Sequence, residues 1–422
     1  MQKSFQKIVV MGLGYIGLPT ASMLATKGHQ VVGVDISEDV VATINSGNIH
    51  IVEPDLDILV RSAVNSGRLK ASLMPEEANT FILAVPTPFK VTEKNPKTPD
   101  ISYVEAATRA IAPFLQEQSL VILESTSPIG TTERVYNIII EFRPELTDKI
   151  HVAHCPERVL PGHIIRELVD NDRIIGGISK EAANSARELY KTFCNGNIFL
   201  TDARTAEMAK LTENSYRDTN IAFANELSII CDKLDINVWE LIGLANKHPR
   251  VNILTPGPGV GGHCIAVDPW FIVDAAPEEA RLIKTAREVN DRKPHWVMGK
   301  VKQAVENWHK NDSKSKTVDS RLLPIIACLG LAFKANIDDL RESPALEITR
   351  ELHASGLGEI IVCEPNVNSG FEEFPLIGFD EVLFKADIFV LLVDHEEFKM
   401  VDKKQLYGKT VIDTRGIWSN QD

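Results

Sequence analysis

Short apolar runs alternate with amphipathic segments along the first two hundred residues. Residues 7–11 and 30–34 are such runs, and an apolar helical segment, residues 18–27, lies between them. Near-continuous Ile, Val and Leu runs are typical of parallel strands that are covered on both faces. This region therefore predicts a doubly wound α/β domain. Further strands are predicted at residues 80–85, 119–124 and 150–153.

The pattern changes at Thr201. A long helix without Gly or Pro is predicted from there to Leu234, capped by Thr201 or Asp202, and a further helix follows from about residue 277 to 308. The polar run 310–316 predicts a linker. Apolar runs then return and predict a second doubly covered parallel sheet. Its strands are expected at residues 324–331, 359–363, 387–393 and 410–412.

These patterns predict three domains. Two Rossmann-like α/β domains, residues 1–200 and 323–422, are joined by a helical central domain, residues 201–309, that contains one long helix. A chain of 422 residues is too long for one ordinary core, which agrees with this division.

A glycine fingerprint follows the first strand. Its residues are Gly12, Leu13, Gly14, Tyr15, Ile16 and Gly17, and Asp35 closes the next strand about twenty positions later. The glycines permit a tight turn and the close approach of a pyrophosphate to a helix N-terminus. Because Asp35 accepts hydrogen bonds from a ribose and repels a 2′-phosphate, the predicted cofactor is NAD and not NADP. Thr87 and Thr126, which follow two later strands, are candidate cofactor or water contacts, or helix caps.

A second glycine-rich run, residues 257–271, carries four glycines and two prolines, which argue against a regular helix or a central strand. Cys264 lies within it, and Asp268 follows four residues later. Most cysteines are small buried hydrophobes, but a glycine loop leaves a sulfur accessible. We therefore predict that Cys264 is a covalent nucleophile.

Charge and composition narrow the function. The net charge of −13 argues against a nucleic-acid partner, and an anionic small substrate then requires locally placed Arg and Lys. No apolar run is long enough to span a membrane. The six cysteines are scattered without a C-x-x-C pair, which indicates neither a metal site nor disulfides and favours a reducing cytoplasm.

Basic residues recur near the predicted carboxyl edges of the sheets. The loop 155–162 carries Glu157 and Arg158, and the long helix carries Lys210, Asn214 and Arg217 near one stripe. Such a stripe is most often solvated, and it gains interest only if it faces the cysteine loop. Other candidates are Lys334 and Arg341 in the loop 333–344, and Arg415 after the last strand.

Together these segments resemble the nucleotide-sugar 6-dehydrogenase family over essentially the whole chain. The matching segments are G-L-G-Y-I-G, A-V-P-T-P, E-S-T-S-P-I-G-T-T, C-P-E-R, A-E-M-A-K-L-T-E-N, G-P-G-V-G-G-H-C-I-A-V-D-P and F-K-A-N-I-D-D-L-R-E-S-P. Residues 157–162, 248–252 and 264–271 look most like the branch that oxidises UDP-N-acetyl-D-mannosamine for bacterial surface polysaccharides. Branches that act on UDP-N-acetylglucosamine tend to have Pro where this chain has Ala266.

The resemblance implies a four-electron oxidation of a primary alcohol to a carboxylate with two NAD. It implies that Cys264 forms the thiohemiacetal and thioester and that Lys210 is the base, with Asn214 at the oxyanion and Asp268 orienting Lys210 or a water. Glu157, with a water held by Thr126, would serve hydrolysis. UDP-glucose dehydrogenases carry a second Glu where this chain has Pro161, so a role for that carboxylate is not transferred.

The resemblance also implies the binding residues and the assembly. It implies a homodimer that pairs through the long central helix, with Arg250 reaching the neighbouring site. The residues implied at the cofactor are Gly12, Gly14, Tyr15, Ile16, Gly17, Asp35, Thr87, Thr126 and Arg341. Those implied at the UDP-sugar are Arg158, Val159, Lys210, Asn214, Arg217, His248, Arg250, Gly261, Phe333, Lys334 and Arg415.

Three alternatives remain open on the sequence. A UDP-N-acetylglucosamine dehydrogenase would share the chemistry. A β-hydroxyacid dehydrogenase also joins a Rossmann domain to a long helix with a Lys–Asn pair, but it releases one NADH per substrate instead of two. A catalytically silent sugar-nucleotide-binding protein would be expected to have lost Cys264 or Lys210, and both are present.

Overall fold

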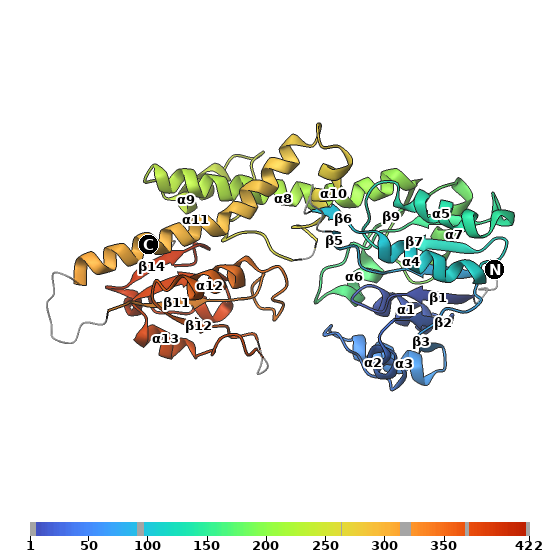
Figure 1. The fold of residues 1–422 in the computed structure, drawn as a ribbon, viewed down its shortest axis with the longest axis horizontal. Coiled ribbons are helices and arrows are strands. Elements are labelled where there is room, and N and C mark those ends of the chain that lie inside the picture. The colour runs from blue at the N-terminus through green and yellow to red at the C-terminus, as the bar shows by residue number, and fades with distance from the viewer. Residues whose placement is uncertain (1–5, 91–96, 263, 313–321, 368–370, 419–422) are drawn as a thin grey trace. The chain divides into compact units, whose positions relative to one another are not determined.

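The computed structural model describes residues 6–90, 97–262, 264–312, 322–367 and 371–418. His263 of the glycine-rich run and residues 313–316 of the predicted linker lie outside the described residues. The chain divides into two compact units (Figure 1). Unit 1 is Met1–Glu213 with Trp270–Pro277, and unit 2 is Asn214–Pro269 with Glu278–Asp422.

Unit 1 is built on an eight-stranded sheet with the order β10-β9-β8-β7-β4-β1-β2-β3. Neighbouring strands are parallel except β8 and β9, whose antiparallel pairing departs from the predicted all-parallel sheet. A separate antiparallel pair is formed by β5 (Phe89–Lys90) and β6 (Thr98–Pro99). The strands of the large sheet are β1 (Lys7–Met11), β2 (Gln30–Val34), β3 (Leu69–Ser72), β4 (Thr80–Leu83), β7 (Leu120–Leu123), β8 (His151–His154), β9 (Arg173–Gly177) and β10 (Ile198–Asp202).

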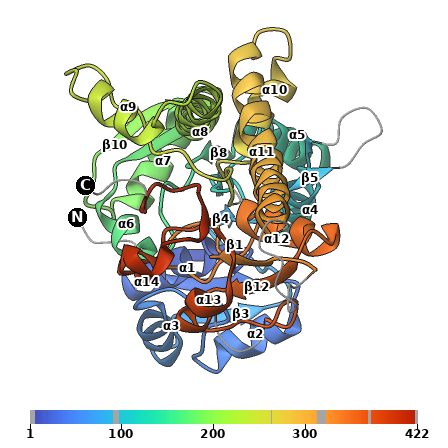
Figure 2. The same cartoon turned by 90° about the vertical axis from the view of Figure 1, so that its left-hand side faces the viewer.

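Helices cover both faces of this sheet because successive strand residues point to opposite sides. Ile8, Val10 and Ile82 pack in one core with α1, α3 and α7, whereas Val9, Phe81 and Leu83 pack in another with α4 and α5. Figure 2 shows α4 and α5 on one side of β4 and β8, and α6 and α7 on the other. The helices of this unit are α1 (Gly17–Thr26), α2 (Glu38–Asn45), α3 (Leu56–Asn65), α4 (Ser102–Ile111), η1 (Ala112–Phe114), α5 (Thr131–Phe142), η2 (Pro144–Leu146), α6 (Ile164–Asp170) and α7 (Lys180–Tyr190).

Unit 2 contains long helices and a four-stranded parallel sheet with the order β12-β11-β13-β14. Helix α8 (Ala203–Lys233) begins in unit 1 and continues through unit 2. As predicted, Asp202 caps it, because its carboxylate accepts the Thr205 N–H at 2.9 Å. The other elements are α9 (Val238–Ala245), α11 (Arg281–Asp312), β11 (Ile325–Leu329), α12 (Pro344–Ser355), β12 (Glu359–Cys363), α13 (Phe379–Lys385), β13 (Ile388–Leu391), α14 (Glu396–Lys399), η3 (Lys403–Leu406) and β14 (Thr410–Asp413).

The sheet of unit 2 is also covered on both faces, as predicted. Ile326, Ile388 and Val390 pack with residues of α11 and α12, whereas Ala327 and Phe389 pack with α13 and α14. Figure 1 shows α12 and α13 on opposite sides of β11 and β12. The prediction for residues 257–271 was wrong at its end, because α10 (Asp268–Ala275) begins inside that run, with Pro269 in its first turn, where proline is tolerated.

Helix α8 buries polar residues and exposes apolar ones. Phe223 and Ile230 are 52% and 45% exposed. Asp218, Asn225 and Ser228 are buried and bond to residues of α11.

Candidate active site

The fingerprint turn between β1 and α1 has the geometry that the glycines predict. Gly12 has φ +89°, and a Cβ there would lie 2.6 Å from the Ala84 carbonyl oxygen. A Cβ on Gly17 would lie 1.9 Å from the Gly12 carbonyl oxygen, so this pair packs too closely for any side chain. By contrast, nothing lies within 4 Å of the Cβ position of Gly14. The turn therefore has open space over Gly14, beside the N-terminus of α1, where a pyrophosphate can approach.

Asp35 lies directly after β2 and faces this turn. One carboxylate oxygen accepts the Leu13 N–H at 3.0 Å and the other accepts the Ser37 N–H at 3.0 Å. Ile36, which follows, is 92% exposed. An exposed apolar side chain next to the predicted ribose acceptor can pack against an adenine ring, and Ile36 was not among the predicted site residues.

The hydroxyl-rich turns after β4 and β7 are joined. The Thr87 hydroxyl donates to the Thr126 carbonyl oxygen at 2.6 Å, and the Ser125 hydroxyl donates to the Val85 carbonyl oxygen at 2.6 Å. These residues therefore lie at the carboxyl edge of the sheet, as predicted, and there a doubly wound fold binds its ligand.

Glu157 is held on both carboxylate oxygens. One accepts the Arg158 N–H at 2.8 Å, and the other accepts from the Arg173 guanidinium at 3.1 Å. Both Glu157 and Arg173 are buried. Arg173 was not among the predicted site residues, although a charged residue at the start of the apolar strand β9 was a usable signal.

A second buried carboxylate, Glu124, lies in the same cluster. It accepts the Tyr190 hydroxyl at 3.0 Å, and the Tyr190 ring lies 4.6 Å from the centre of the Arg173 guanidinium. Burial raises the pKa of Glu124 from its usual 4.5 to about 8, and the charge of Glu157 adds to this effect. Burial likewise raises the pKa of Cys155 to about 12, so that thiol stays protonated and packed.

The first part of α8 carries Lys210 and is anchored in unit 1 by Glu207. This buried carboxylate accepts the Gly130 and Thr132 N–H groups, at 2.6 and 2.7 Å, and the Thr132 hydroxyl. Burial lowers the pKa of nearby His154 to about 3, and the Lys210 charge adds to this effect. Lys210 is half-buried, and its helix is fixed to the turn that begins at Thr126.

In unit 2, Cys264 is exposed on the loop before α10, as its predicted role requires. Its carbonyl oxygen accepts the Asp268 N–H at 2.9 Å. The Asp268 carboxylate accepts from the Asn214 amide at 2.5 Å, and both side chains are buried. The structure therefore brings Asn214 and Asp268 together next to the Cys264 segment.

The glycine-rich loop packs against the loop 333–344. The Cβ position of Gly261 lies 2.5 Å from the Glu342 carbonyl oxygen and 2.8 Å from Phe333 Cβ. The Cβ position of Gly257 lies 2.6 Å from an Arg415 guanidinium nitrogen. Two residues predicted from distant parts of the sequence, Phe333 and Arg415, therefore lie beside the loop that contains Gly261.

Several predicted binding residues have other partners. The Arg158 guanidinium pairs with Glu213 at 2.6 Å, and that of Arg341 pairs with Asp339 at 2.6 Å. Arg415 also pairs with Asp394, at 2.8 Å. Val159 is half-buried, and the remaining predicted binding residues are exposed: Arg217, His248, Arg250 and Lys334.

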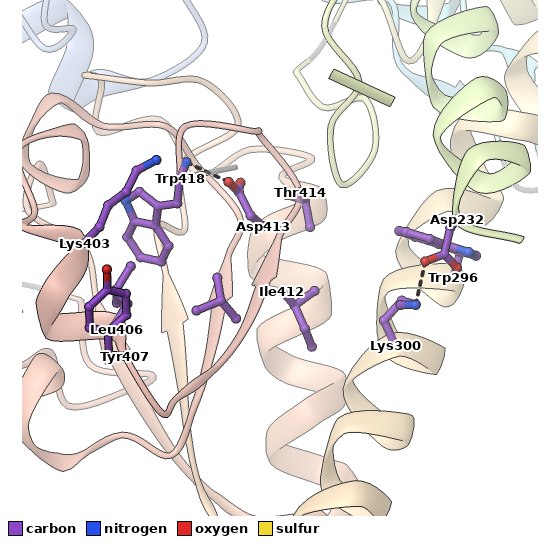
Figure 3. Close-up of a pocket in the computed structure, with 11 residues that line it drawn as sticks. Asp232, Trp296, Lys300, Lys403, Leu406, Tyr407, Ile412, Asp413, Thr414 and Trp418 are labelled. Atoms are coloured by element: carbon purple, nitrogen blue, oxygen red, sulfur yellow. Dashed lines mark hydrogen bonds and ion pairs between the residues drawn. The ribbon is translucent and has the colours of Figure 1, made fainter. Parts of the chain in front are cut away.

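A pocket of about 540 Å³ in unit 2 lies beside β14 (Figure 3). Within it Lys300 pairs with Asp232 at 2.6 Å, and Asp413 accepts the Trp418 N–H at 2.8 Å. No predicted site residue lines it, so pocket shape alone does not find the predicted chemistry. The lining residues are Asp232, Trp296, Lys300, Lys403, Leu406, Tyr407, Val411, Ile412, Asp413, Thr414 and Trp418.

Within the described ranges, no helix has both the length and the apolarity needed to cross a membrane.

Comparison with known proteins identifies three consecutive domains of the UDP-glucose/GDP-mannose dehydrogenase family. Residues 6–194 match its NAD binding domain, residues 204–292 its central domain, and residues 327–420 its UDP binding domain. NAD is therefore the cofactor of the first domain.

The similarity to individual relatives extends over nearly the whole chain. The chain is 57% identical over 426 residues to the NDP-N-acetyl-D-galactosaminuronic acid dehydrogenase of Ralstonia nicotianae, covering 98% of this chain and 97% of that protein. It is 54% identical over 428 residues to the UDP-N-acetyl-D-mannosamine dehydrogenase of Escherichia coli (strain K12), covering 98% and 100%. The structure of UDP-D-ManNAc dehydrogenase from Pyrococcus horikoshii matches with a TM-score of 0.86 at 42% identity, over 97% of this chain and 96% of that one.

Proposed function

Because this chain belongs to the UDP-glucose/GDP-mannose dehydrogenase family, we propose that it oxidises the C6 alcohol of UDP-N-acetyl-D-mannosamine to the carboxylate. Relatives that carry the corresponding name are 54% and 55% identical over nearly their full length, and this similarity carries the substrate proposal. The product would serve the synthesis of bacterial surface polysaccharides. The balanced reaction consumes one alcohol, two NAD⁺ and one water, and it yields one carboxylate, two NADH and three protons.

NAD, when bound, supplies the hydride acceptor for each of the two oxidations. The residues of this turn fit NAD. The backbone at Gly12 leaves no space for a side chain, and the space over Gly14 is open. The Asp35 carboxylate lies beside the turn, where it can accept hydrogen bonds from the ribose. Thr87 and Thr126 lie at the same carboxyl edge. The segment from Gln30 to Ser37, which contains β2 and Asp35, has no Lys or Arg, and this favours NAD over NADP.

Different side chains of this protein are proposed to carry the separate steps of the reaction. Lys210 takes the proton of the C6 hydroxyl in the first oxidation, and the Asn214 amide, oriented by Asp268, donates to the oxygen as charge develops. The Cys264 thiolate then adds to the aldehyde carbon, and the new C–S bond holds the intermediate until it is oxidised to a thioester. Water cleaves that bond, and the sulfur recovers a proton.

Glu157 is proposed to help this last step through a carboxylate oxygen near the attacking water. One carboxylate oxygen pairs with Arg173 and the other accepts the Arg158 N–H, so the group is held in one orientation. Because both oxygens already accept a hydrogen bond, Glu157 would act on water through a remaining lone pair.

The substrate proposal is tested by kcat/KM for a panel of UDP-sugars with NADH counted per sugar. UDP-N-acetyl-D-mannosamine should be preferred, with two NADH released. UDP-glucose should be rejected strongly, because a site that bonds the acetamido group is left with an unpaired partner. Equal use of UDP-glucose or UDP-N-acetylglucosamine would contradict the substrate and leave the dehydrogenase class intact.

A second candidate substrate is a nucleotide-linked N-acetyl-D-galactosamine, because the 57% identical Ralstonia relative is named NDP-N-acetyl-D-galactosaminuronic acid dehydrogenase. The panel therefore includes UDP-N-acetylgalactosamine. The residues proposed to sense the sugar are on the loop from His248 to Asn252 and at Arg158 and Val159. Since the Arg158 side chain is paired with Glu213, its contribution would come through the backbone or after that pair opens.

Covalent catalysis is tested with Cys264→Ser. This variant should stop at or before the first oxidation and keep its affinity for NAD, because the cofactor turn lies in another domain. Five other cysteines are buried, so none replaces the lost thiol. Steady release of two NADH per sugar by this variant would refute the thioester. The need for a reduced thiol also favours a cytoplasmic location.

We also propose a homodimer that pairs through α8. Tyr216, Phe223 and Ile230 are 70%, 52% and 45% exposed and recur every seven residues, so they lie near one face of the helix. Such a face suits a second copy of the same helix. Phe223→Lys should therefore convert a dimer to a monomer in sedimentation, whereas Tyr407→Lys, at an exposed residue outside α8, should not.

Arg250 is proposed to reach the site of the neighbouring subunit. Mixing an Arg250→Ala preparation with a Cys264→Ser preparation tests this, since each is expected to be inactive. Hybrid dimers would regain one complete site only if Arg250 acts across the interface. Absence of activity after subunit exchange, with exchange shown by mass spectrometry, would place Arg250 in its own subunit's site.

A further inference from the structure

A chain of buried polar side chains runs between α8 and α11 and ends on the loop that carries Cys264. Asp218 accepts from the Arg287 guanidinium at 2.5 Å and from the Asn290 amide at 2.8 Å. The Asn225 amide donates to the Asn290 amide oxygen at 2.9 Å. The Asn225 oxygen in turn accepts the Gly257 N–H at 2.8 Å.

Every side chain in this network is nearly inaccessible to solvent. Asp218 and Asn225 have no exposed surface, and Arg287 and Asn290 are each 1% exposed. Burying polar groups is unfavourable unless they are hydrogen-bonded, and the low dielectric then makes each correct bond strong and directional. The network therefore holds the side-chain oxygen of Asn225 more rigidly than the oxygen of a solvent-exposed asparagine would be held.

Two asparagines of α8 bond to the two ends of the loop from Gly257 to Asp268, which carries Cys264. Asn225 holds the backbone at Gly257, and Asn214 holds Asp268, where α10 begins. The two asparagines are eleven residues apart, close to three helical turns, so they share one face of α8 and are separated by ~16 Å along its axis. The ends of the loop are also eleven residues apart, and Cys264 lies between them.

The glycines in the middle of the loop are packed too closely to accept a side chain. Gly262 has φ +85°, and the Cβ positions of Gly259 and Gly261 lie within 2.8 Å of Pro344 and 2.5 Å of the Glu342 carbonyl oxygen. Four of the six residues from Gly257 to Gly262 are glycines, and such a segment has a high conformational entropy in the unfolded state. Its position therefore depends on these close contacts and on the anchors at its ends.

We propose that Asn225 is a positioning residue that fixes the loop carrying Cys264, and so the position of the Cys264 sulfur relative to the substrate. Hydrogen bonds through Asn290, Asp218 and Arg287 hold Asn225 in place. It does not touch the reacting atoms. This inference rests on the proposed function for the meaning of Cys264, but the anchoring of the loop can be measured without any substrate. Asn214 acts at the other end of the loop and is already part of the proposed chemistry.

The test compares Asn225→Leu, Asn290→Ala and the control Ser228→Ala. Ser228 is also buried on α8, where its hydroxyl accepts from Lys293 and donates to the Asn225 backbone carbonyl oxygen, so its loss reports the effect of disturbing α8 at Asn225 while the Asn225 side chain is kept. Amide hydrogen exchange is measured for the peptide that contains Gly257 in each protein, alone and with NAD. In Asn225→Leu this exchange should be at least tenfold faster than in Ser228→Ala, and in Asn290→Ala it should change in the same direction by less.

Kinetics supply the second readout. Asn225→Leu should lower kcat at least tenfold while KM for NAD stays within twofold, because the NAD-binding turn is separate from this loop. If Asn225→Leu does not fold, Asn290→Ala decides the question, since it keeps the oxygen that accepts Gly257 N–H and removes only its brace. Loop exchange and kcat within twofold of the Ser228→Ala control would overturn the proposal.

The two levels of inference fail separately. If the panel of UDP-sugars gave no NADH, the proposed function would fall, while accelerated exchange at Gly257 would still support the anchor. If turnover were found but exchange and kcat did not respond to Asn225, the anchor would fall alone.

Discussion

Replacing Glu124 with Gln should stabilise the NAD-binding unit increasingly as pH rises. Glu124 is 1% exposed, and burial raises its pKa from 4.5 to about 8. Between these values the unfolded chain is ionised and the folded chain keeps the proton. The folded state therefore loses stability as pH rises from 4.5 to 8, and it has none of this penalty below 4.5.

The size of the penalty follows from the two pKa values. At pH 7 the difference from the unfolded value is 2.5 pH units, which corresponds to ~3 kcal/mol at 1.36 kcal/mol per unit. Gln has no charge to bury, and its amide oxygen can still accept the Tyr190 hydroxyl. For a unit of about 200 residues, ~3 kcal/mol corresponds to roughly 6–12 °C in Tm.

The assay is thermal unfolding of both proteins from pH 5 to pH 8.5, using the transition that NAD shifts upward to identify the first unit. Any pH-independent cost of the amide cancels when the difference in Tm is followed against pH. The control is Glu117→Gln, at an exposed residue paired with Lys149. A Tm difference for Glu124→Gln that stays constant within about 1 °C over this range would refute the reasoning.

The remaining predictions concern the cofactor, the base and the loop. Asp35→Ala should raise the Kd for NAD and reduce the preference over NADP in titrations, because the ribose acceptor and its charge are both lost; unchanged affinities would contradict the cofactor assignment. Lys210→Ala should lower kcat by ~10²–10⁴-fold with a smaller effect on KM, as expected for a general base; a change in KM alone would make it a substrate anchor. Gly261→Ala should impair UDP-sugar binding measured by calorimetry, because the new methyl group meets Phe333 and the Glu342 carbonyl. Binding equal to that of the parent would show that the loop accommodates a methyl group at residue 261, which would contradict this prediction.

Much of the fold was predictable because its signals are local. The fingerprint from Gly12 to Gly17 and the acidic Asp35 lie within two strands and one helix, and the structure places them as expected. The α/β architecture, NAD and the family are confirmed by the fold and by the domain matches. The domain limits and the roles of the individual site residues remain predictions.

The supports of the site were not predictable in the same way. Arg173 and Glu157 are sixteen residues apart, and Tyr190 and Glu124 are sixty-six apart. No spacing rule connects such pairs, since they meet only through the order of the strands. What the sequence does show is a charged residue beside a buried strand, and each such residue needs a partner elsewhere.

Hydrophobic periodicity alone does not determine which face of helix α8 packs within the chain. An apolar stripe indicates a surface to be covered, but it does not say whether the cover is the same chain or another copy. Phe223 and Ile230 are exposed and carry the proposal of a homodimer, whereas the polar Asp218 and Asn225 lie on the side that α11 covers. A buried polar face between two helices is stable only if its partners are in register, which ties α8 to α11 at particular turns. That fixed register lets an asparagine on α8 hold the backbone of the loop that carries Cys264.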